Sequence, residues 1–143
     1  MSKFVIHGGR PIKGHVRVSG NKNASLPMIA AALLTDEEVV LENVPGIRDV
    51  ASMLEIARYL GAEVDREGST VRIRAREIAT HEIPWELCEK NRTSFLFVAP
   101  LLHRVAVAHV HQPGGDMIGR RRLDAHFYGF EKLGCQVDPE SFK

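Results

Sequence analysis

The stretch LGAEVD at residues 60–65 returns later in the chain as LGCQVD at residues 133–138. Each copy follows a helical pattern of apolar residues and has a glycine where such a helix would end. The segments before the two copies also share one order, which is an apolar helix, a β-rich run, a Pro-Gly turn and a second helix. This agreement predicts an α/β fold built from a duplicated helix–strand–helix–strand unit. The alternative is chance similarity between two ordinary α/β stretches, which the shared LGxxVD pattern disfavours.

Apolar periodicity and turn residues predict the elements of the first copy. It comprises a helix over 25–34, a strand over 39–42, a turn over 43–46, a helix ending at Gly61, and strands over 62–65 and 70–74. Pro27 is expected in the first turn of the first helix, where a missing N–H costs little. Asp49 is expected to cap the second helix, because its side chain can accept hydrogen bonds from free helix N–H groups.

The second copy is predicted in the same way. It comprises a helix over 94–102, a strand over 105–110, a turn at 113–114, a helix over 124–133 and a final strand ending at residue 138. Two further strands are expected before the first copy, at Lys3–His7 and His15–Ser19, because apolar and polar residues alternate there.

The composition restricts the broad class of protein. The 143 residues are 44% hydrophobic, which is enough for one sizeable core, and the formal net charge is only +1. This charge balance leaves no excess of positive charge to attract nucleic acid, and no apolar run is long enough to span a bilayer. The N-terminus has no signal-peptide pattern. We therefore expect a cytoplasmic protein that binds neither nucleic acid nor membrane.

Cysteines and histidines do not indicate a metal site. Cys88 and Cys135 are far apart and are interpreted as small apolar residues, in a short helix and in a strand respectively. The seven histidines show no ligand spacing. His109 and His111 alternate on a predicted strand, which is more typical of packing or surface than of metal binding. No metal is expected.

The Pro-Gly turn of the second copy is enlarged. The turn and helix of the first copy occupy residues 45–60, whereas the corresponding segment occupies 113–133 and is five residues longer. Extra length in one copy of a repeat is often where function lies. The stretch QPGGDMIGRRRLDAH at 112–126 sets Asp116 among glycines and three arginines, which suit phosphate and carboxylate. It predicts a site for an anionic substrate, and the alternative is a solvated surface loop.

Cations stand near the start of the first helix in both copies. Lys22 and Asn23 begin one helix, and Arg92 begins the other. A helix N-terminus favours anions, so a cation there is unfavourable for the helix alone and suggests a bound anion. The alternative is side chains that simply extend into solvent, and the pattern alone favours neither.

Several motifs together resemble one enzyme family. They are SGNKNASLP at 19–27, NVPGIRDV at 43–50, LGA at 60–62, the arginine at 92 and PGGDMIGRRRLDAH at 113–126. In this order, and with little insertion, they resemble UDP-N-acetylglucosamine 1-carboxyvinyltransferase, an enolpyruvyl transferase. The first and last motifs distinguish that family from its relative 5-enolpyruvylshikimate-3-phosphate synthase.

The resemblance implies a reaction and an architecture. The reaction transfers the enolpyruvyl group of phosphoenolpyruvate to the 3′-hydroxyl of UDP-N-acetylglucosamine and releases phosphate, in the first committed step of peptidoglycan synthesis, without metal or organic cofactor. The architecture is an inside-out α/β barrel of two similar domains, each with three copies of the repeat. Residues 1–21 would belong to the second domain, and residues 22–143 to the first, as units 22–90 and 91–143. The chain is expected to be the front part of a longer, monomeric enzyme and to be inactive alone.

The resemblance also gives roles to particular residues. Lys22 and Arg121 would bind the phosphate and carboxylate of phosphoenolpyruvate, and Asn23 would lie beside the reacting sugar. Arg92 would contact phosphate groups and the mobile loop. The uridine side of the nucleotide site would be lined by Arg121, Arg122, Leu123, Asp124 and Ala125. Of these, Arg122 and Ala125 stand where the family commonly has proline and leucine.

Asp116 stands where the family most often has a cysteine that acts as an acid. A carboxyl group can also deliver a proton to the methylene carbon of phosphoenolpyruvate. An ordinary aspartate has a pKa of about 3.9, so this role requires desolvation to raise the pKa against the lowering effect of neighbouring arginines. Fosfomycin alkylates the family cysteine, and a carboxylate is a poorer nucleophile, so we expect resistance to that drug.

Two other classes of function remain open from the sequence. One is a domain that binds a nucleotide sugar without catalysis, and the other is a purely structural piece without a ligand. Binding of UDP-N-acetylglucosamine separates these two classes.

Overall fold

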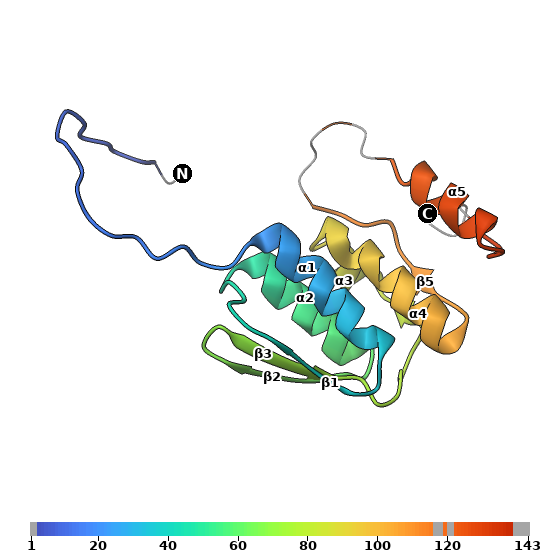
Figure 1. Ribbon diagram of the computed structural model, residues 1–143. Coiled ribbons are helices and arrows are strands. Elements are labelled where there is room, and N and C mark those ends of the chain that lie inside the picture. Colours follow the sequence, from blue (N-terminus) through green and yellow to red (C-terminus); the bar gives the residue numbers. More distant parts are fainter. Residues whose placement is uncertain (1–2, 116–118, 120–121, 139–143) are drawn as a thin grey trace.

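The computed structural model describes residues 3–115, 119 and 122–138, which form a mixed helix and strand structure (Figure 1). The elements, with 3₁₀ helices labelled η, are α1 (Lys22–Ala31), η1 (Ala32–Leu34), β1 (Glu38–Leu41), α2 (Arg48–Tyr59), β2 (Glu63–Glu67), β3 (Thr70–Arg74), β4 (Glu82–Ile83), α3 (Trp85–Cys88), η2 (Arg92–Phe97), α4 (Val98–Val105), β5 (His109–Val110) and α5 (Asp124–Lys132). The predicted α/β class is confirmed, and the order helix–strand–helix occurs in both halves of the chain.

Strands β1, β3 and β2 form an antiparallel sheet in that order. The register pairs Val39 of β1 with Ile73 of the central strand. Since side chains alternate between the two faces of a strand, Val71 and Ile73 share one face, and both are fully buried. Helices α1 and α2 cover this face (Figure 1). The other face is charged and includes an ion pair between Arg72 and Glu38.

The hydrophobic core lies between this sheet and the helices. Helices α1, α2 and α4 all bury their apolar positions in it. Its large, fully buried side chains include Ile29, Leu33, Met53, Ile56, Leu60, Ile73, Ile83, Phe97 and Leu101. Each such burial contributes about 1.5–3 kcal/mol, so this core carries most of the favourable free energy that holds the N-termini of the helices in place.

Steric constraints explain why a glycine follows Leu60 in the first copy of the repeated pattern. Gly61 follows the end of α2 with a φ of +105°, which L side chains rarely adopt. A Cβ on Gly61 would also lie 2.9 Å from the backbone nitrogen of Ala79, whose N–H donates to the carbonyl of Leu60. Gly134 takes a φ of +91° after α5. Both copies therefore end their second helix on a left-handed glycine, as predicted.

The second half packs beside the first. Strands β4 and β5 pair in parallel, with Ile83 opposite Val110. Helix α5 lies at the far side of α4 from α1 (Figure 1). Phe95 of η2 contacts it through the rings of Phe127 and Phe130, at centroid distances of 5.9 and 6.4 Å.

Arg104, in the last turn of α4, joins segments that are distant in sequence. Its guanidinium donates to the carbonyls of Leu33 and Thr35 at 3.0 and 2.9 Å. It also donates to the carbonyls of Ala75 and Arg76 at 3.0 and 2.9 Å. A planar guanidinium has fixed donors that suit such an arrangement. Arg104 therefore ties α4 to the segments that follow η1 and β3.

The two strands predicted at Lys3–His7 and His15–Ser19 are wrong for this chain. Residues 3–20 form neither helix nor strand, and this segment extends away from the body (Figure 1). Phe4 and Ile12 are 97% and 98% exposed. A strand requires a neighbour to take its backbone hydrogen bonds, and none of the described strands pairs with this segment. The alternation of apolar and polar residues indicated strands, but it could not specify a partner strand.

Two details of the first copy also differ. Helix α1 begins at Lys22, so Pro27 lies inside the helix and not in its first turn. The helix starts early because the Asn21 side chain accepts a hydrogen bond from the N–H of Ala24. Asp49 does not cap α2, since the N-cap residue is Ile47, whose side chain makes no capping hydrogen bond. Asp49 is the second residue of the helix, and its carboxylate points to another partner.

The second copy departs from prediction in its strands. Val105 is the last residue of α4, and Ala106 leaves the helix with a φ of +61°, so β5 comprises only two residues of the predicted strand. The predicted strand containing Cys135 is not formed, because residues 135–138 have no strand partner among the described residues. Cys135 is half-buried. By contrast, Cys88 is fully buried in a short helix, as predicted.

We predict that Arg104→Met lowers the free energy of unfolding by about 3 kcal/mol, because it leaves four carbonyls without a charged donor. Urea denaturation measures this change. The matched control is Arg58→Met, which removes one exposed hydrogen bond of 3.3 Å to the carbonyl of Val64 and should cost less than about 1 kcal/mol. Equal losses in the two variants would contradict the role given to Arg104.

Candidate functional site

The start of α1 lies against the start of α2 through one ion pair. Lys22 is the first residue of α1, and its ammonium group pairs with the carboxylate of Asp49 in the first turn of α2. A carboxylate at a helix N-terminus is favourable, whereas a cation there is not. The Asp49 carboxylate therefore offsets the positive charge of Lys22. It lies where the sequence suggested a bound anion.

The start of η2 reaches the same place through Asn91. The Nδ2 atom of Asn91 donates to the backbone carbonyl of Asp49 at 3.2 Å. Its Oδ1 atom accepts from the N–H and the hydroxyl of Thr93, at 3.0 and 2.7 Å, and so caps η2. Asn91 is 7% exposed. Three helix N-termini, those of α1, α2 and η2, are thus joined at Asp49.

Arg92 follows Asn91 and extends the cluster toward the enlarged loop. Its Nη2 atom lies 3.5 Å from the carbonyl of Arg122. The Arg122 side chain in turn pairs with the carboxylate of Asp124, the first residue of α5. Arg122 and Asp124 are exposed, and Arg92 is half-buried. A chain of contacts through Asp49, Asn91 and the Arg122 carbonyl therefore links the described cations of both helix starts and of the loop.

Two glycines fix where the enlarged loop departs. The N–H groups of Gly114 and Gly115 donate to the carbonyls of Cys88 and Glu89, at 3.0 and 3.2 Å. A Cβ on Gly114 would lie 2.0 Å from the Glu89 carbonyl oxygen, so no other residue fits there without moving the backbone. A Cβ on Gly115 would lie 3.3 Å from the backbone nitrogen of Arg92. The loop therefore departs directly beside Arg92.

The other predicted site residues differ in their exposure and in whether the structure describes them. Asn23, the second residue of α1, is exposed beside Lys22. Leu123 is the half-buried N-cap residue of α5, and Ala125 is exposed in its first turn. Asp116 and Arg121 lie outside the described residues.

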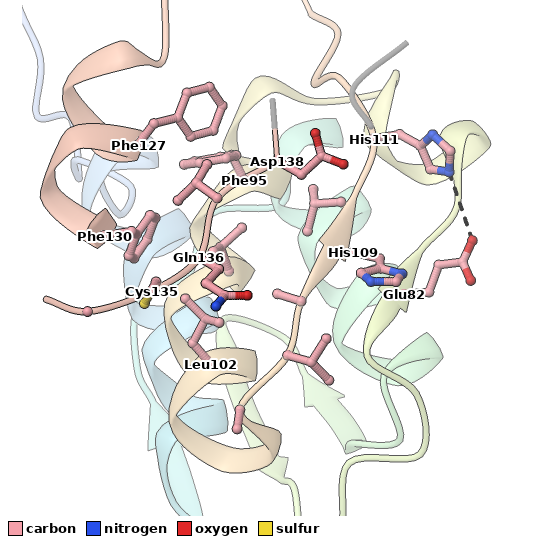
Figure 2. Close-up of a pocket in the computed structure, with 17 residues that line it drawn as sticks. Glu82, Phe95, Leu102, His109, His111, Phe127, Phe130, Cys135, Gln136 and Asp138 are labelled. Carbon is pink, nitrogen blue, oxygen red and sulfur yellow. Dashed lines mark ion pairs between the residues drawn. The ribbon is translucent and has the colours of Figure 1, made fainter. Parts of the chain in front are cut away.

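A second candidate is a cavity of about 850 Å³ between α4, β5 and α5. Figure 2 shows Phe95, Phe127 and Phe130 on one side of it and His109 and His111 on the other. Glu82 and Asp138 also line it, whereas none of its lining residues in the described part of the chain is a lysine or arginine. His111 lies 3.9 Å from Glu82. Such a mostly apolar cavity, with carboxylates at its edge, is a poor site for a phosphorylated substrate.

Cys88 is a poor candidate for a nucleophile. It is fully buried, its sulfur contacts the carbonyl of Ile83 at 3.5 Å, and burial raises the pKa of its thiol. A thiol in such a place stays protonated and unreactive at neutral pH. The described residues hold no group of three or more histidine, cysteine or acidic side chains able to bind a metal ion. Nor does the described chain include a helix long and apolar enough to cross a membrane.

Sequence reasoning missed two residues of this cluster. It interpreted Asp49 as a cap, and it did not identify Asn91. A signal for Asn91 existed, because asparagine is a favoured N-cap residue and stands directly before a helix start. No local signal showed that Asp49 would reach Lys22, since 27 positions separate the two residues.

Comparison with known proteins identifies related sequences. Residues 6–142 match the family described as EPSP synthase (3-phosphoshikimate 1-carboxyvinyltransferase). Proteins named UDP-N-acetylglucosamine 1-carboxyvinyltransferase from Borreliella burgdorferi, Treponema pallidum and Treponema denticola are 47%, 51% and 43% identical to the chain. These alignments cover 96%, 96% and 98% of the chain but 32%, 32% and 33% of the relatives. The chain thus spans about a third of the length of these relatives.

A solved structure is also similar. The crystal structure of the enolpyruvyl transferase NikO from Streptomyces tendae matches with a TM-score of 0.66 and 33% sequence identity, over 72% of this chain and 24% of that one. This likeness confirms the predicted type of fold, although 24% coverage leaves the number of repeats in the whole protein a prediction.

We predict that the Lys22–Asp49 pair contributes little to stability. The two side chains are 52% and 33% exposed, and exposed pairs contribute about 0–1 kcal/mol. A double-mutant cycle with Lys22→Met and Asp49→Asn, read from urea denaturation, should give a coupling energy below about 1 kcal/mol. The exposed pair between Lys90 and Glu55 provides a matched control cycle. A coupling above about 2 kcal/mol for Lys22 and Asp49 alone would show that the pair holds the fold together.

Proposed function

Because the chain belongs to the EPSP synthase (3-phosphoshikimate 1-carboxyvinyltransferase) family, we propose that the protein is an enolpyruvyl transferase acting on phosphoenolpyruvate and UDP-N-acetylglucosamine. The enolpyruvyl group passes to the sugar 3′-hydroxyl and phosphate is released. The observation that carries this proposal is the chain of contacts that runs from Lys22 through Asp49 and Asn91 to the start of η2, where Arg92 reaches the carbonyl of Arg122. Free N–H groups, macrodipoles and fixed cations all favour a phosphate there.

The choice of sugar nucleotide over 3-phosphoshikimate is supported by the relatives. The three relatives with 43–51% identity are named for UDP-N-acetylglucosamine, although the family description is that of EPSP synthase. The motifs at 19–27 and 113–126 resemble the same subgroup. Peptidoglycan synthesis in the cytoplasm, with consequences for cell shape and division, is the corresponding cellular role.

The proposed roles of the residues follow from the site and the resemblance. Lys22 binds the phosphate of phosphoenolpyruvate, and the incoming anion competes with Asp49 for its ammonium group. Asn23 lies beside the sugar hydroxyl, and Arg92 contacts phosphate. Arg121 binds phosphoenolpyruvate from the enlarged loop. The uridine side of the nucleotide site is formed by Arg121, Arg122, Leu123, Asp124 and Ala125.

Asp116 is the proposed proton donor in the addition step. Its proton goes to the methylene carbon of phosphoenolpyruvate while the sugar oxygen bonds to the neighbouring carbon and its own proton passes to a general base and then to solvent. Elimination then breaks the carbon–oxygen bond to phosphate, and a proton passes from the new methyl group to the carboxylate left by the addition step, which restores the double bond and the acid. The role of the protein is to place an acid and fixed cations around the charge that develops.

The domain assignment is part of the same proposal. Residues 1–21 pair with the second domain, while units 22–90 and 91–143 form part of the first, and the whole enzyme is a monomer. The extended backbone of residues 3–20, with exposed Phe4 and Ile12, supports a segment whose partner lies elsewhere.

Titration calorimetry of the chain with UDP-N-acetylglucosamine tests the nucleotide site. We expect saturable binding, and Asp124→Ala should weaken it about tenfold, as expected for loss of one charge-assisted hydrogen bond. Asp65→Ala, at an exposed position on β2, is the matched control and should bind as the unmodified chain does. Absence of binding would favour a purely structural role and contradict the proposal.

Fosfomycin tests the identity of the acid at position 116. Intact-mass measurement after incubation with the drug should show no adduct, because a carboxylate is a weaker nucleophile than a thiolate. Asp116→Cys should add the mass of one drug molecule. The same measurement in a Cys135→Ser background excludes reaction at the half-buried cysteine. A stable adduct on Asp116 would overturn this prediction.

A further inference from the structure

Asn91 makes one hydrogen bond more than helix capping requires. Its side chain is buried, and both ends of its amide are used. The oxygen receives two donors from Thr93, which fixes the orientation of the amide because a nitrogen in that position would face those donors. The nitrogen is therefore directed to the carbonyl of Asp49 at 3.2 Å.

Asp49 is thereby held on two sides. Its backbone is fixed by Asn91, and its carboxylate pairs with Lys22. Asn91 and Lys22 do not belong to the same helix, so the position of the Lys22 ammonium group relative to Arg92 depends on this chain of contacts. An aspartate at position 91 could still cap η2 but would have no donor for Asp49, and the single, shorter hydroxyl of serine or threonine cannot replace both ends of the amide, which accepts from Thr93 and donates to Asp49.

We infer that Asn91 is a positioning residue that sets Lys22 relative to Arg92 by fixing Asp49. This inference rests on the proposed function, since it concerns the binding of the phosphoenolpyruvate anion by those two cations. Asn91 does not touch the substrate. It keeps the first turns of α2 and η2 at a fixed distance, so that both cations can reach one phosphate group.

The alternative role is capping alone, and the chain provides a matched control for it. Asn21 is the N-cap of α1, and its side chain accepts from the N–H of Ala24 at 3.0 Å. Asn21→Ser and Asn91→Ser make the same change at two caps, and serine caps a helix about as well as asparagine. Only the change at position 91 removes a donor to Asp49.

The first measurement needs no ligand. The ion pair holds the Lys22 nitrogen against the carboxylate of Asp49, so an acylating reagent reaches that nitrogen less readily while the pair is formed. Peptide mass spectrometry of partly acylated protein gives the rate at Lys22 relative to the other lysines. We expect this relative rate to rise about fivefold in Asn91→Ser, as expected from the loss of one hydrogen bond, and to stay unchanged in Asn21→Ser. An unchanged rate in Asn91→Ser would overturn the inference.

The second measurement is binding of phosphoenolpyruvate by calorimetry. We expect Asn91→Ser to weaken binding about fivefold in the unmodified chain but to have no further effect in a Lys22→Met background, because the two residues act through one contact. A fivefold loss in both backgrounds would show that Asn91 does not act through Lys22. If the unmodified chain does not bind phosphoenolpyruvate while acylation still accelerates, the proposed function fails and the positioning contact stands.

Discussion

The hydrogen bond from Asn91 to the backbone of Asp49, with the ion pair from Asp49 to Lys22, is the constraint on which the candidate site depends. These contacts bring three helix N-termini to one place, and each N-terminus adds a partial positive charge. The sequence adds cations where isolated helices would disfavour them. The cations therefore lower the stability of the individual helices but make this surface suited to anions, which is typical of a binding site.

Contacts far from the cluster position the helices that carry it. Arg104 ties α4 to the ends of η1 and β3, and the core sets α1 and α2 on the sheet. The start of η2, which precedes α4, is therefore placed by contacts at both ends of this helical segment. Gly114 then fixes the departure of the enlarged loop by its close approach to Glu89. Each of these contacts joins residues from separate elements, which is why the surface is formed only in the folded chain.

Local pattern predicted the helices and the three strands of the first copy, β1, β2 and β3, but it failed for the strands before the first copy and for most of those in the second. The apolar stripes of α1 and α2, and the left-handed glycines after α2 and α5, follow from spacing and backbone sterics within a few residues. The strands expected at Lys3–His7 and His15–Ser19 failed because pairing depends on a neighbour that the local sequence does not specify. The same limit applies to the site. The cations at the helix starts were recognisable, whereas Arg104, Asn91 and the partner of Lys22 depend on contacts between distant residues.

The central claim is that the cluster at the helix N-termini, and not the apolar cavity lined by Phe95, binds the phosphorylated substrate. Amide proton–nitrogen NMR spectra recorded during titration with phosphoenolpyruvate test this claim most directly. The account predicts shift changes concentrated at residues 22–25, 48–50 and 91–94. Changes concentrated at residues 107–111 and 127–138, which surround the cavity of about 850 Å³, would contradict it.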